Sequence, residues 1–468
     1  MFKKIRHIHF VGIGGIGMSG IAEVLANLGY KISGSDLKRS PITVRLAKKG
    51  AKIFYGHRAS HIEGAHVVVI SSAVRPTNPE WTTAQEKGIP VVTRAEMLAE
   101  LMRLKYGIAV AGSHGKTTTT SLVANVLYQA GLDPTLVIGG RVKSFRSNAK
   151  LGKGEFLVAE ADESDGSFMK LSPTIAVITN IDPEHMDHYH SFEELKATFV
   201  NFANKIPFYG AVVACVDHPT VKEILPQIKK RVVTYGLTET ADFYARDIQQ
   251  QGLQERFEVF HRGVSLGKVT LKLAGLHNVY NALAAIAVGH ELEIPFKQIV
   301  KGLGSFKGIE RRMETLYKGR EAWVIDDYGH HPEEIKATLS ALRMAFPDRR
   351  IVTLFQPHRY TRTRDLFAEF QGAFGNTDLL LLTEVYAAGE DPIAGVSGES
   401  LALAMKKKKD ETGIYFSADK ETLADEAARI IRPNDVIVTL GAGDIVKVGR
   451  KIAQWLRKKE KHVSAPIH

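Results

Sequence analysis

The stretch Gly112-Ser113-His114-Gly115-Lys116-Thr117-Thr118-Thr119 decides how the rest of the sequence is interpreted. It follows an apolar, strand-like run at 108–111 and precedes a helical pattern. Backbone N–H groups at such a helix start face phosphate oxygens, and the helix dipole favours their negative charge. Lys116 adds a point charge for the β- and γ-phosphates, and Thr117 offers a hydroxyl to Mg²⁺. The stretch therefore predicts a phosphate-binding loop, although Val110 stands where the full pattern has glycine.

Acidic residues and histidines follow the next two apolar runs. Glu160 comes directly after the run at 156–159, a position from which a carboxylate binds the Mg²⁺ of a neighbouring phosphate loop. The acidic cluster 160–165 has a second interpretation as a solvated loop, but the phosphate loop upstream favours a metal site. Histidines occur at 185, 188 and 190 after another apolar run. Because zinc sites show tighter pairs of Cys or His, we expect one histidine to help hold a metal beside phosphates instead.

A glycine-rich turn near the N-terminus predicts a second nucleotide site. Gly12-Ile13-Gly14-Gly15-Ile16-Gly17 follows an apolar run, and Asp36 comes nineteen residues after Gly17. This fingerprint forms a tight turn that places a pyrophosphate on a helix N-terminus. A UDP-sugar carries a pyrophosphate and a ribose as a dinucleotide does. The turn therefore predicts a diphosphate nucleotide without specifying NAD.

Two polar segments in the last third of the chain also follow apolar runs. Asp326-Asp327-Tyr328-Gly329-His330-His331-Pro332 follows 322–325, and the arginine-rich segment 356–364 follows 351–355. Open α/β sheets bind ligands at the carboxyl ends of their strands. The planar arginine side chains suit carboxylate or phosphate, with ordinary surface charge as the alternative.

The order of apolar runs and helical patterns predicts an α/β protein with three βα units. A chain of 468 residues is long enough for about two to four domains. We expect a first domain over 1–105, a second over 106–308 that includes a β-rich stretch at 231–273, and a third over 309–468. Strands that alternate with helices favour parallel sheets.

Composition and charge exclude several classes of protein. No stretch reaches the roughly 18 apolar residues of a membrane span. The single cysteine, Cys215, is expected to be a small buried strand residue and cannot form an internal disulfide. The net charge of +11 fits anionic small substrates, because the basic residues are spread along the chain rather than clustered as for nucleic acid. We therefore expect a cytoplasmic protein that binds neither nucleic acid nor a membrane.

Together these motifs resemble one family, the Mur ligases of bacterial cell-wall synthesis, over about residues 5–455. The resemblance rests on segments 9–19, 71–74, 112–119, 160–165, 276–278 with Asn281, 311–312, 326–332, 358–362 and 440–445. It is strongest to the alanine-adding branch, which implies UDP-N-acetylmuramate and L-alanine as substrates. The implied role is in peptidoglycan synthesis, and so in cell shape and division, by a monomer or weak homodimer.

The resemblance implies a three-domain fold and assigns ATP to the central domain. A Rossmann-like domain would bind the UDP-sugar, a P-loop ATPase-like domain would bind ATP, and a second Rossmann-like domain would close with the amino acid. The implied ATP contacts are Gly112, Ser113, His114, Gly115, Lys116, Thr117, Thr118, Asn278, Asn281, Arg312 and Asp327. The implied ligands of Mg²⁺, or of Mn²⁺ in its place, are Thr117, Glu160 and His185.

The resemblance also assigns the two other substrates. The implied UDP-sugar contacts are Gly12, Gly14, Gly15, Ile16, Gly17, Asp36, His57, Ser71 and Ser72. The implied contacts of the amino acid are Tyr328, His330, Arg359 and Arg362. The expected catalytic groups are Lys116, His185 and His330, with His330 as the candidate base for the amine.

Two positions depart from the family pattern. Glu184 stands before His185 where the family usually has Asp. Several Mur ligases have a carbamylated lysine about ten residues past the position of Tyr189, and this chain has Phe199 there. The alanine-adding branch is similar in lacking that lysine.

The predicted chemistry is an ATP-dependent joining of a carboxylate to an amine. Phosphorylation turns the carboxylate into an acyl phosphate, which the amine attacks with loss of phosphate, and ADP is the other product. Three alternatives differ in what they leave unexplained. A tripeptide-adding Mur-type ligase would share all the motifs. A nicotinamide-dependent oxidoreductase rests on the first glycine motif alone and leaves Lys116, Glu160 and the arginine segment unexplained. A non-catalytic nucleotide-binding module would show no ATP turnover with any candidate substrate.

Overall fold

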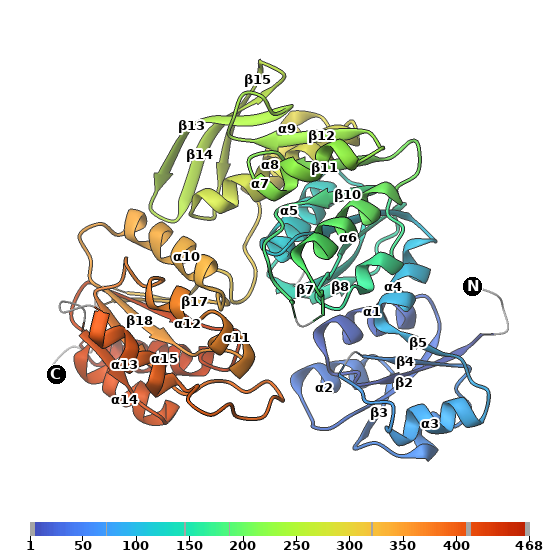
Figure 1. The fold of residues 1–468 in the computed structure, drawn as a ribbon, viewed down its shortest axis with the longest axis horizontal. Helices are drawn as coiled ribbons and strands as arrows, with labels where there is room; N and C mark the ends of the chain where they lie inside the picture. The colour runs from blue at the N-terminus through green and yellow to red at the C-terminus, as the bar shows by residue number, and fades with distance from the viewer. Residues whose placement is uncertain are drawn as a thin grey trace. The chain divides into compact units, whose positions relative to one another are not determined.

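The computed structural model describes residues 5–71, 73–144, 147–186, 188–319, 322–408 and 413–463. Its strands form three sheets, of five, ten and six strands (Figure 1). The chain divides into two compact units, each described here by itself. One comprises residues 1–247, 257–270 and 280–307, and the other comprises 248–256, 271–279 and 308–468.

The first sheet has the strand order β3-β2-β1-β4-β5, and all its pairs are parallel. The order reverses between β1 and β4, so a crevice for a ligand is expected at the carboxyl ends of these strands. Its elements are β1 (His7–Val11), α1 (Ile16–Asn27), β2 (Lys31–Asp36), α2 (Pro41–Lys48), β3 (Lys52–Tyr55), η1 (Ala59–Ile62), β4 (Val67–Ile70), α3 (Pro79–Glu86), β5 (Val91–Thr93) and α4 (Arg94–Met102).

The second sheet has the order β15-β14-β13-β12-β11-β10-β6-β9-β7-β8. Strand β6 lies between β10 and β9, parallel to both, and its buried residues explain its central place. The elements up to α6 are β6 (Tyr106–Ala111), α5 (Lys116–Gln129), β7 (Thr135–Val142), β8 (Ser147–Lys150), β9 (Phe156–Glu160), η2 (Ser167–Lys170), β10 (Ile175–Ile178) and α6 (Phe192–Asn204). The rest are β11 (Ala211–Cys215), α7 (Pro219–Ile224), η3 (Leu225–Gln227), β12 (Val232–Gly236), β13 (Phe243–Gln251), β14 (Gln254–His261), β15 (Val264–Leu271), α8 (Leu276–Glu291) and α9 (Phe296–Gly304).

The third sheet has the order β16-β17-β21-β18-β19-β20, with β16 as an antiparallel edge strand. Strands β17 and β18 both pair with β21, so the segments that follow them start at one edge of the sheet. The elements are β16 (Glu314–Lys318), β17 (Ala322–Asp327), α10 (Pro332–Ala345), β18 (Ile351–Phe355), α11 (Tyr360–Asp365), α12 (Phe367–Gln371), β19 (Leu379–Leu382), α13 (Gly398–Lys408), β20 (Gly413–Phe416), α14 (Lys420–Ile430), β21 (Asp435–Leu440) and α15 (Val446–Val463).

The predicted α/β class is confirmed, because most strand pairs are parallel and helices separate the strands. The β-rich stretch at 231–273 forms β12 to β15, and Cys215 is a buried residue of β11 as expected. Among the described residues, no helix is long and apolar enough to cross a membrane. The predicted boundaries at 105 and 308 stay predictions.

Candidate active site

The phosphate loop joins β6 to α5 through two glycines in the left-handed region. Gly112 has φ +133, and a Cβ there would lie 2.1 Å from the Thr179 hydroxyl oxygen. Gly115 has φ +80, and a Cβ there would lie 2.6 Å from Asn281 Oδ1. Both glycines are therefore required by backbone conformation and by close neighbours. The helical pattern expected over 121–129 lies within α5, which begins earlier, at Lys116.

The loop is fixed by the segment after β10. The backbone N–H of His114 donates to Asn180 Oδ1 at 2.7 Å, and the Thr179 hydroxyl donates to the His114 carbonyl at 2.7 Å. The Asp182 N–H donates to the Ser113 hydroxyl at 2.8 Å. These contacts fix the backbone of the loop against the segment after β10.

Lys116 folds back over its own loop. Its Nζ donates to the carbonyls of Gly112 at 2.5 Å and Ser113 at 3.1 Å, and to Glu163 Oε1 at 2.8 Å. Burial works against the charged ammonium, but the carboxylates of Glu163 and Asp162 outweigh it and raise the pKa of Lys116. The side chain is therefore a fixed positive charge at the point where the loop would meet a phosphate.

The residues predicted to bind a metal fall in two places. Glu160 ends β9, where one carboxylate oxygen accepts the Gly139 N–H at 2.7 Å. The ligand atoms of Glu163, Glu184 and His185 lie within 4.8 Å of one another, with Glu163 Oε1 3.7 Å from His185 Nε2. Glu163 Oε2 is buried and has no hydrogen-bond partner among the described residues. An orphaned carboxylate oxygen beside a histidine fits a divalent cation, so Glu163 joins Glu160 as a candidate ligand.

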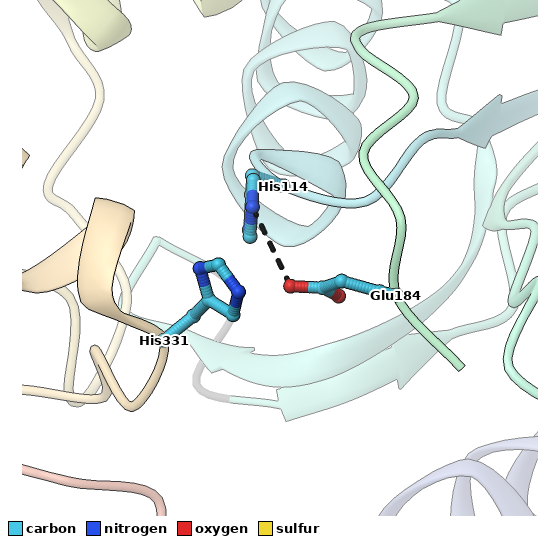
Figure 2. A group of neighbouring side chains, drawn as sticks. All are labelled: His114, Glu184 and His331. Carbon is cyan, nitrogen blue, oxygen red and sulfur yellow. Dashed lines mark ion pairs between the residues drawn. The ribbon is translucent and has the colours of Figure 1, made fainter. Parts of the chain in front are cut away.

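His185 has backbone φ +60, which non-glycine residues rarely adopt. Its carbonyl accepts the N–H groups of His188 and Tyr189 at 2.9 and 3.0 Å, which hold this conformation. Backbone strain of this kind clusters at functional sites, where the surrounding structure holds a residue in an unfavourable conformation. Glu184 faces a second histidine across an ion pair, with its carboxylate 3.5 Å from His114 Nε2 (Figure 2).

The glycine turn of the first sheet is built around Asp36. The Gly14 N–H donates to Asp36 Oδ2 at 2.8 Å, and a Cβ at Gly14 would lie only 2.7 Å from that oxygen. Gly12 has φ +80 and approaches Ser71, whose hydroxyl oxygen would lie 3.2 Å from a Cβ there. Gly15 caps α1 without a side chain, and Ile16 begins the helix. The predicted contact Ser72 lies outside the described residues.

Arg94 links this turn to the acidic loop of the second sheet. A Cβ at Gly17 would lie 3.1 Å from Arg94 Cδ, and the Arg94 guanidinium pairs with Asp162 at 3.3 Å. Asp162 belongs to the same loop as Glu163, which pairs with Lys116. The two predicted nucleotide loops are thus joined by a short chain of contacts that the sequence analysis did not identify.

The predicted residues of the third sheet form two groups at the ends of β17 and β18. Asp327 accepts the Met313 and Gly329 N–H groups, both at 2.8 Å. Arg311 and Arg312 lie over the Tyr328 ring, at 4.9 and 5.1 Å from its centroid. Arg311 was part of a recognised motif but not a predicted contact. Both guanidiniums also face carboxylates, Arg311 that of Asp326 at 3.2 Å and Arg312 that of Glu334 at 3.8 Å.

His330 meets the arginine segment in the same unit. Its ring lies 5.8 Å from the His358 ring, and Arg362 contacts the His358 carbonyl at 3.3 Å. Burial lowers the pKa of His330 to about 3 and that of His358 to about 4. Because His330 Nδ1 donates to the Tyr328 carbonyl at 3.1 Å, its Nε2 carries the lone pair. Arg359 has φ +70 at the start of α11.

Models of one family match three successive parts of the chain: the Mur ligase catalytic domain at 7–106, the Mur ligase middle domain at 110–289, and the glutamate ligase domain of Mur ligases at 311–443. The chain belongs to the Mur ligase family. Its predicted three-domain fold is confirmed. Family membership makes the chain a ligase and supports ATP as the nucleotide of the phosphate loop.

Individual proteins match this Mur ligase over nearly its whole length. The UDP-N-acetylmuramate–L-alanine ligase of Desulfatibacillum aliphaticivorans is 57% identical, over 96% of this chain and 98% of the relative. The ligase of the same name from Geobacter sp. (strain M21) is 56% identical, over 98% and 99%. The crystal structure of the UDP-N-acetylmuramate–alanine ligase of Thermotoga maritima is 29% identical, with a TM-score of 0.83 over 97% of this chain and 99% of that one. A murein peptide ligase from Psychrobacter arcticus, at 24% identity and a TM-score of 0.72, shares the fold over 96% and 98%.

Proposed function

We propose that this Mur ligase joins L-alanine to the carboxylate of UDP-N-acetylmuramate, with ATP as the energy source, as the first amino-acid addition to a peptidoglycan precursor. The observation that carries the proposal is the 57% identity to an alanine-adding ligase along 96% of the chain. The reaction releases ADP and phosphate. The tripeptide-adding alternative has weaker support, from solved peptide-adding ligases that are 24% and 29% identical to this chain, the second over 66% of it.

The phosphate loop supplies the charge that phosphoryl transfer requires. Lys116 is held as a cation and sits beside the backbone N–H groups that begin α5. As the γ-phosphoryl group moves to the sugar carboxylate, the ammonium compensates charge on the transferred oxygens. To do so, it must exchange its contacts with the Gly112 and Ser113 carbonyls for phosphate oxygens.

Thr117, Glu160 and His185 are the proposed ligands of Mg²⁺, and the orphaned oxygen of Glu163 offers a further carboxylate beside His185. The ion would lower the charge repulsion between the triphosphate and the incoming carboxylate. Hard oxygen donors favour Mg²⁺ or Mn²⁺ over softer metals.

We propose that His330 and the arginine segment receive the amino acid. A neutral His330 ring with its lone pair on Nε2 accepts a hydrogen bond from the amine, while Arg359 or Arg362 offers a planar fork to the carboxylate. A pKa of about 3 makes the ring a weak proton acceptor. Its first role is therefore to orient the amine.

An ATP-turnover assay with varied acceptors tests the proposal. We expect phosphate release only when UDP-N-acetylmuramate, Mg²⁺ and L-alanine are present together. Equal turnover with a tripeptide in place of alanine would replace the proposal with the tripeptide-adding alternative. Turnover without any UDP-sugar would refute the ligase assignment for these substrates.

A further inference from the structure

Glu80 is a fully buried carboxylate on a helix beside the first sheet. It is not one of the predicted site residues, and its burial requires an explanation. It lies in the first turn of α3, where its N–H donates to the Asn78 side chain at 2.9 Å. Its exposed fraction is 0%. A carboxylate at a helix N-terminus is ordinary when it faces water. This side chain is buried instead, against β1, β2 and η1.

Both Glu80 oxygens are occupied by donors from separate elements. Oε1 lies 3.2 Å from the Arg58 N–H and 2.7 Å from His61 Nδ1. Oε2 lies 2.5 Å from the Ser35 hydroxyl and 3.4 Å from His9 Nε2. Burial opposes ionisation, but the hydrogen bonds from His9, Ser35 and His61 outweigh it and lower the pKa of Glu80 to about 2. The carboxylate is therefore ionised and accepts hydrogen bonds only.

This acceptor determines where the proton of His57 lies. A serine hydroxyl has one proton, and the Ser35 proton points to Glu80. Toward His57 Nδ1, 3.0 Å away, the Ser35 oxygen can then only accept. His57 Nδ1 also lies 3.5 Å from Glu80 itself, which excludes a lone pair on that nitrogen. In the neutral ring, Nδ1 thus carries the proton and Nε2 carries the lone pair.

His57 stands where a nucleotide on the glycine turn would reach. It follows Gly56, whose N–H donates to the Asp36 carbonyl at 2.9 Å. Asp36 in turn accepts the Gly14 N–H of the turn. The His57 side chain is 18% exposed, and no described residue bonds its Nε2. The described residues therefore leave this acceptor available for a ligand, next to the segment that carries Asp36 and the glycine turn.

We propose that Glu80 and Ser35 are positioning residues that fix His57 as the Nδ1–H tautomer, so that Nε2 accepts a hydrogen bond from the nucleoside of the UDP-sugar. The donor is the imide N–H of the base or the 2′-hydroxyl of the ribose. The identity of this ligand rests on the proposed function, whereas the tautomer does not depend on it.

Replacing Glu80 with Gln should reverse the donor and acceptor roles along the hydrogen bonds that link Glu80, Ser35 and His57. The glutamine oxygen must face the Arg58 N–H, because a backbone donor cannot reverse its role. The amide NH₂ then faces Ser35, whose hydroxyl turns to donate to His57 Nδ1. The His57 proton moves to Nε2, and the acceptor becomes a donor. Two donors then oppose each other in the complex, which costs affinity as an unpaired polar group does.

Nitrogen-15 NMR of histidine-labelled protein measures the tautomer directly, with the His57→Gln variant assigning the signal. We expect Nδ1–H for His57 in the wild-type protein and Nε2–H in Glu80→Gln. His7 is the internal control, since its Nδ1 contacts the Gly64 carbonyl at 2.8 Å and should not change. A wild-type His57 with its proton on Nε2 overturns the proposal even if Glu80→Gln fails to fold. An unchanged His57 tautomer in a folded Glu80→Gln protein also overturns it.

Calorimetric binding of UDP-N-acetylmuramate tests recognition. We expect Glu80→Gln to weaken binding about tenfold with kcat nearly unchanged, and Glu86→Gln, at the exposed end of the same helix, to change neither.

UDP methylated at the base imide and UDP lacking the ribose 2′-hydroxyl distinguish the two donors. The analogue without the true donor should lose affinity for the wild-type protein but not for Glu80→Gln. Equal wild-type affinity for both analogues and UDP overturns the recognition role. Absent turnover with a normal His57 tautomer and normal UDP binding would instead refute the proposed function.

Discussion

The phosphate loop at 112–119 and the glycine turn at 12–17 have the same strand–turn–helix form but handle charge differently. The phosphate loop supplies its own cation, Lys116, and holds it with Glu163. The glycine turn contains no cation, and the carboxylate of Asp36 accepts one of its N–H groups. A second carboxylate nearby, Glu80, is fully buried and is bonded to serine and histidine.

The difference follows from what each loop is proposed to do. Charge moves during phosphoryl transfer, so the phosphate loop benefits from a cation that can exchange carbonyl partners for phosphate oxygens. A UDP-sugar is held but not cleaved at its diphosphate. Fixed N–H groups and oriented neutral side chains are sufficient there, and they select the ligand by geometry. Four substitutions test this contrast.

The largest effect is expected from Lys116→Ala. Loss of a preorganised charge at the transferred phosphoryl group should reduce kcat by about 10²–10³-fold or more. Lys336→Ala is the matched control, because this exposed lysine pairs with Glu333 on α10. Steady-state kinetics for ATP measures both variants. Retained activity in Lys116→Ala would remove the loop from the mechanism.

The pH dependence of the free energy of unfolding should reveal the contribution of the ionised Glu80. Its pKa of about 2 in the folded protein lies below its ordinary value of 4.5. The stability that its ionised form contributes is therefore full above pH 4.5 and disappears as pH falls through 2, roughly 3 kcal/mol in total. The stability difference between wild type and Glu80→Gln in urea should shrink over that window. A difference that does not vary between pH 5 and pH 3 would show that the Glu80 charge contributes nothing.

Gly14→Ala tests the dependence of the glycine turn on Asp36. The new Cβ would lie 2.7 Å from Asp36 Oδ2 and 3.2 Å from Thr43 Cγ2, so one of them must move. We expect a loss of about 1–3 kcal/mol in the free energy of unfolding. Gly15→Ala meets only an ordinary 3.5 Å contact, and its loss should be about 0.5 kcal/mol from the poorer helix cap. Equal losses would contradict the packing argument.

The smallest effect is expected from Arg94→Ala. The ion pair with Asp162 is partly exposed, so its loss should cost at most about 1 kcal/mol of stability. Its functional effect should appear as altered coupling between UDP-sugar and ATP binding, measured as the change in one Kd when the other ligand is present. Identical coupling in the variant would show that the two loops communicate by another route.

Local patterns in the sequence were sufficient for the parts of the site that depend on neighbours along the chain. The helix after the phosphate loop and the β-rich stretch at 231–273 were predicted correctly, because glycine spacing and apolar periodicity encode them directly. The start of that helix at Lys116, within the loop motif itself, was not predicted. The acidic cluster after β9 was also identified. The carboxylate that faces Lys116 could not be chosen, because the turn after Glu160 decides it, and this turn brings Glu163 to the lysine.

The sequence analysis missed Glu80, whose role depends on tertiary packing across four elements. A signal was nevertheless present. His7 and His9 alternate along β1, and Ser33 and Ser35 alternate along the neighbouring strand β2, so one face of two buried strands is polar. Such a polar face requires a buried partner. Periodicity alone could not name the partner as a helical glutamate far along the chain.

The most direct test of the central claim follows oxygen-18 from the carboxylate of labelled UDP-N-acetylmuramate during turnover with ATP and L-alanine. An acyl phosphate transfers one carboxylate oxygen to the released phosphate, so mass spectrometry should find the label there in each turnover. Phosphate without the label, released at the rate of product formation, would contradict activation of the sugar carboxylate by the phosphate loop.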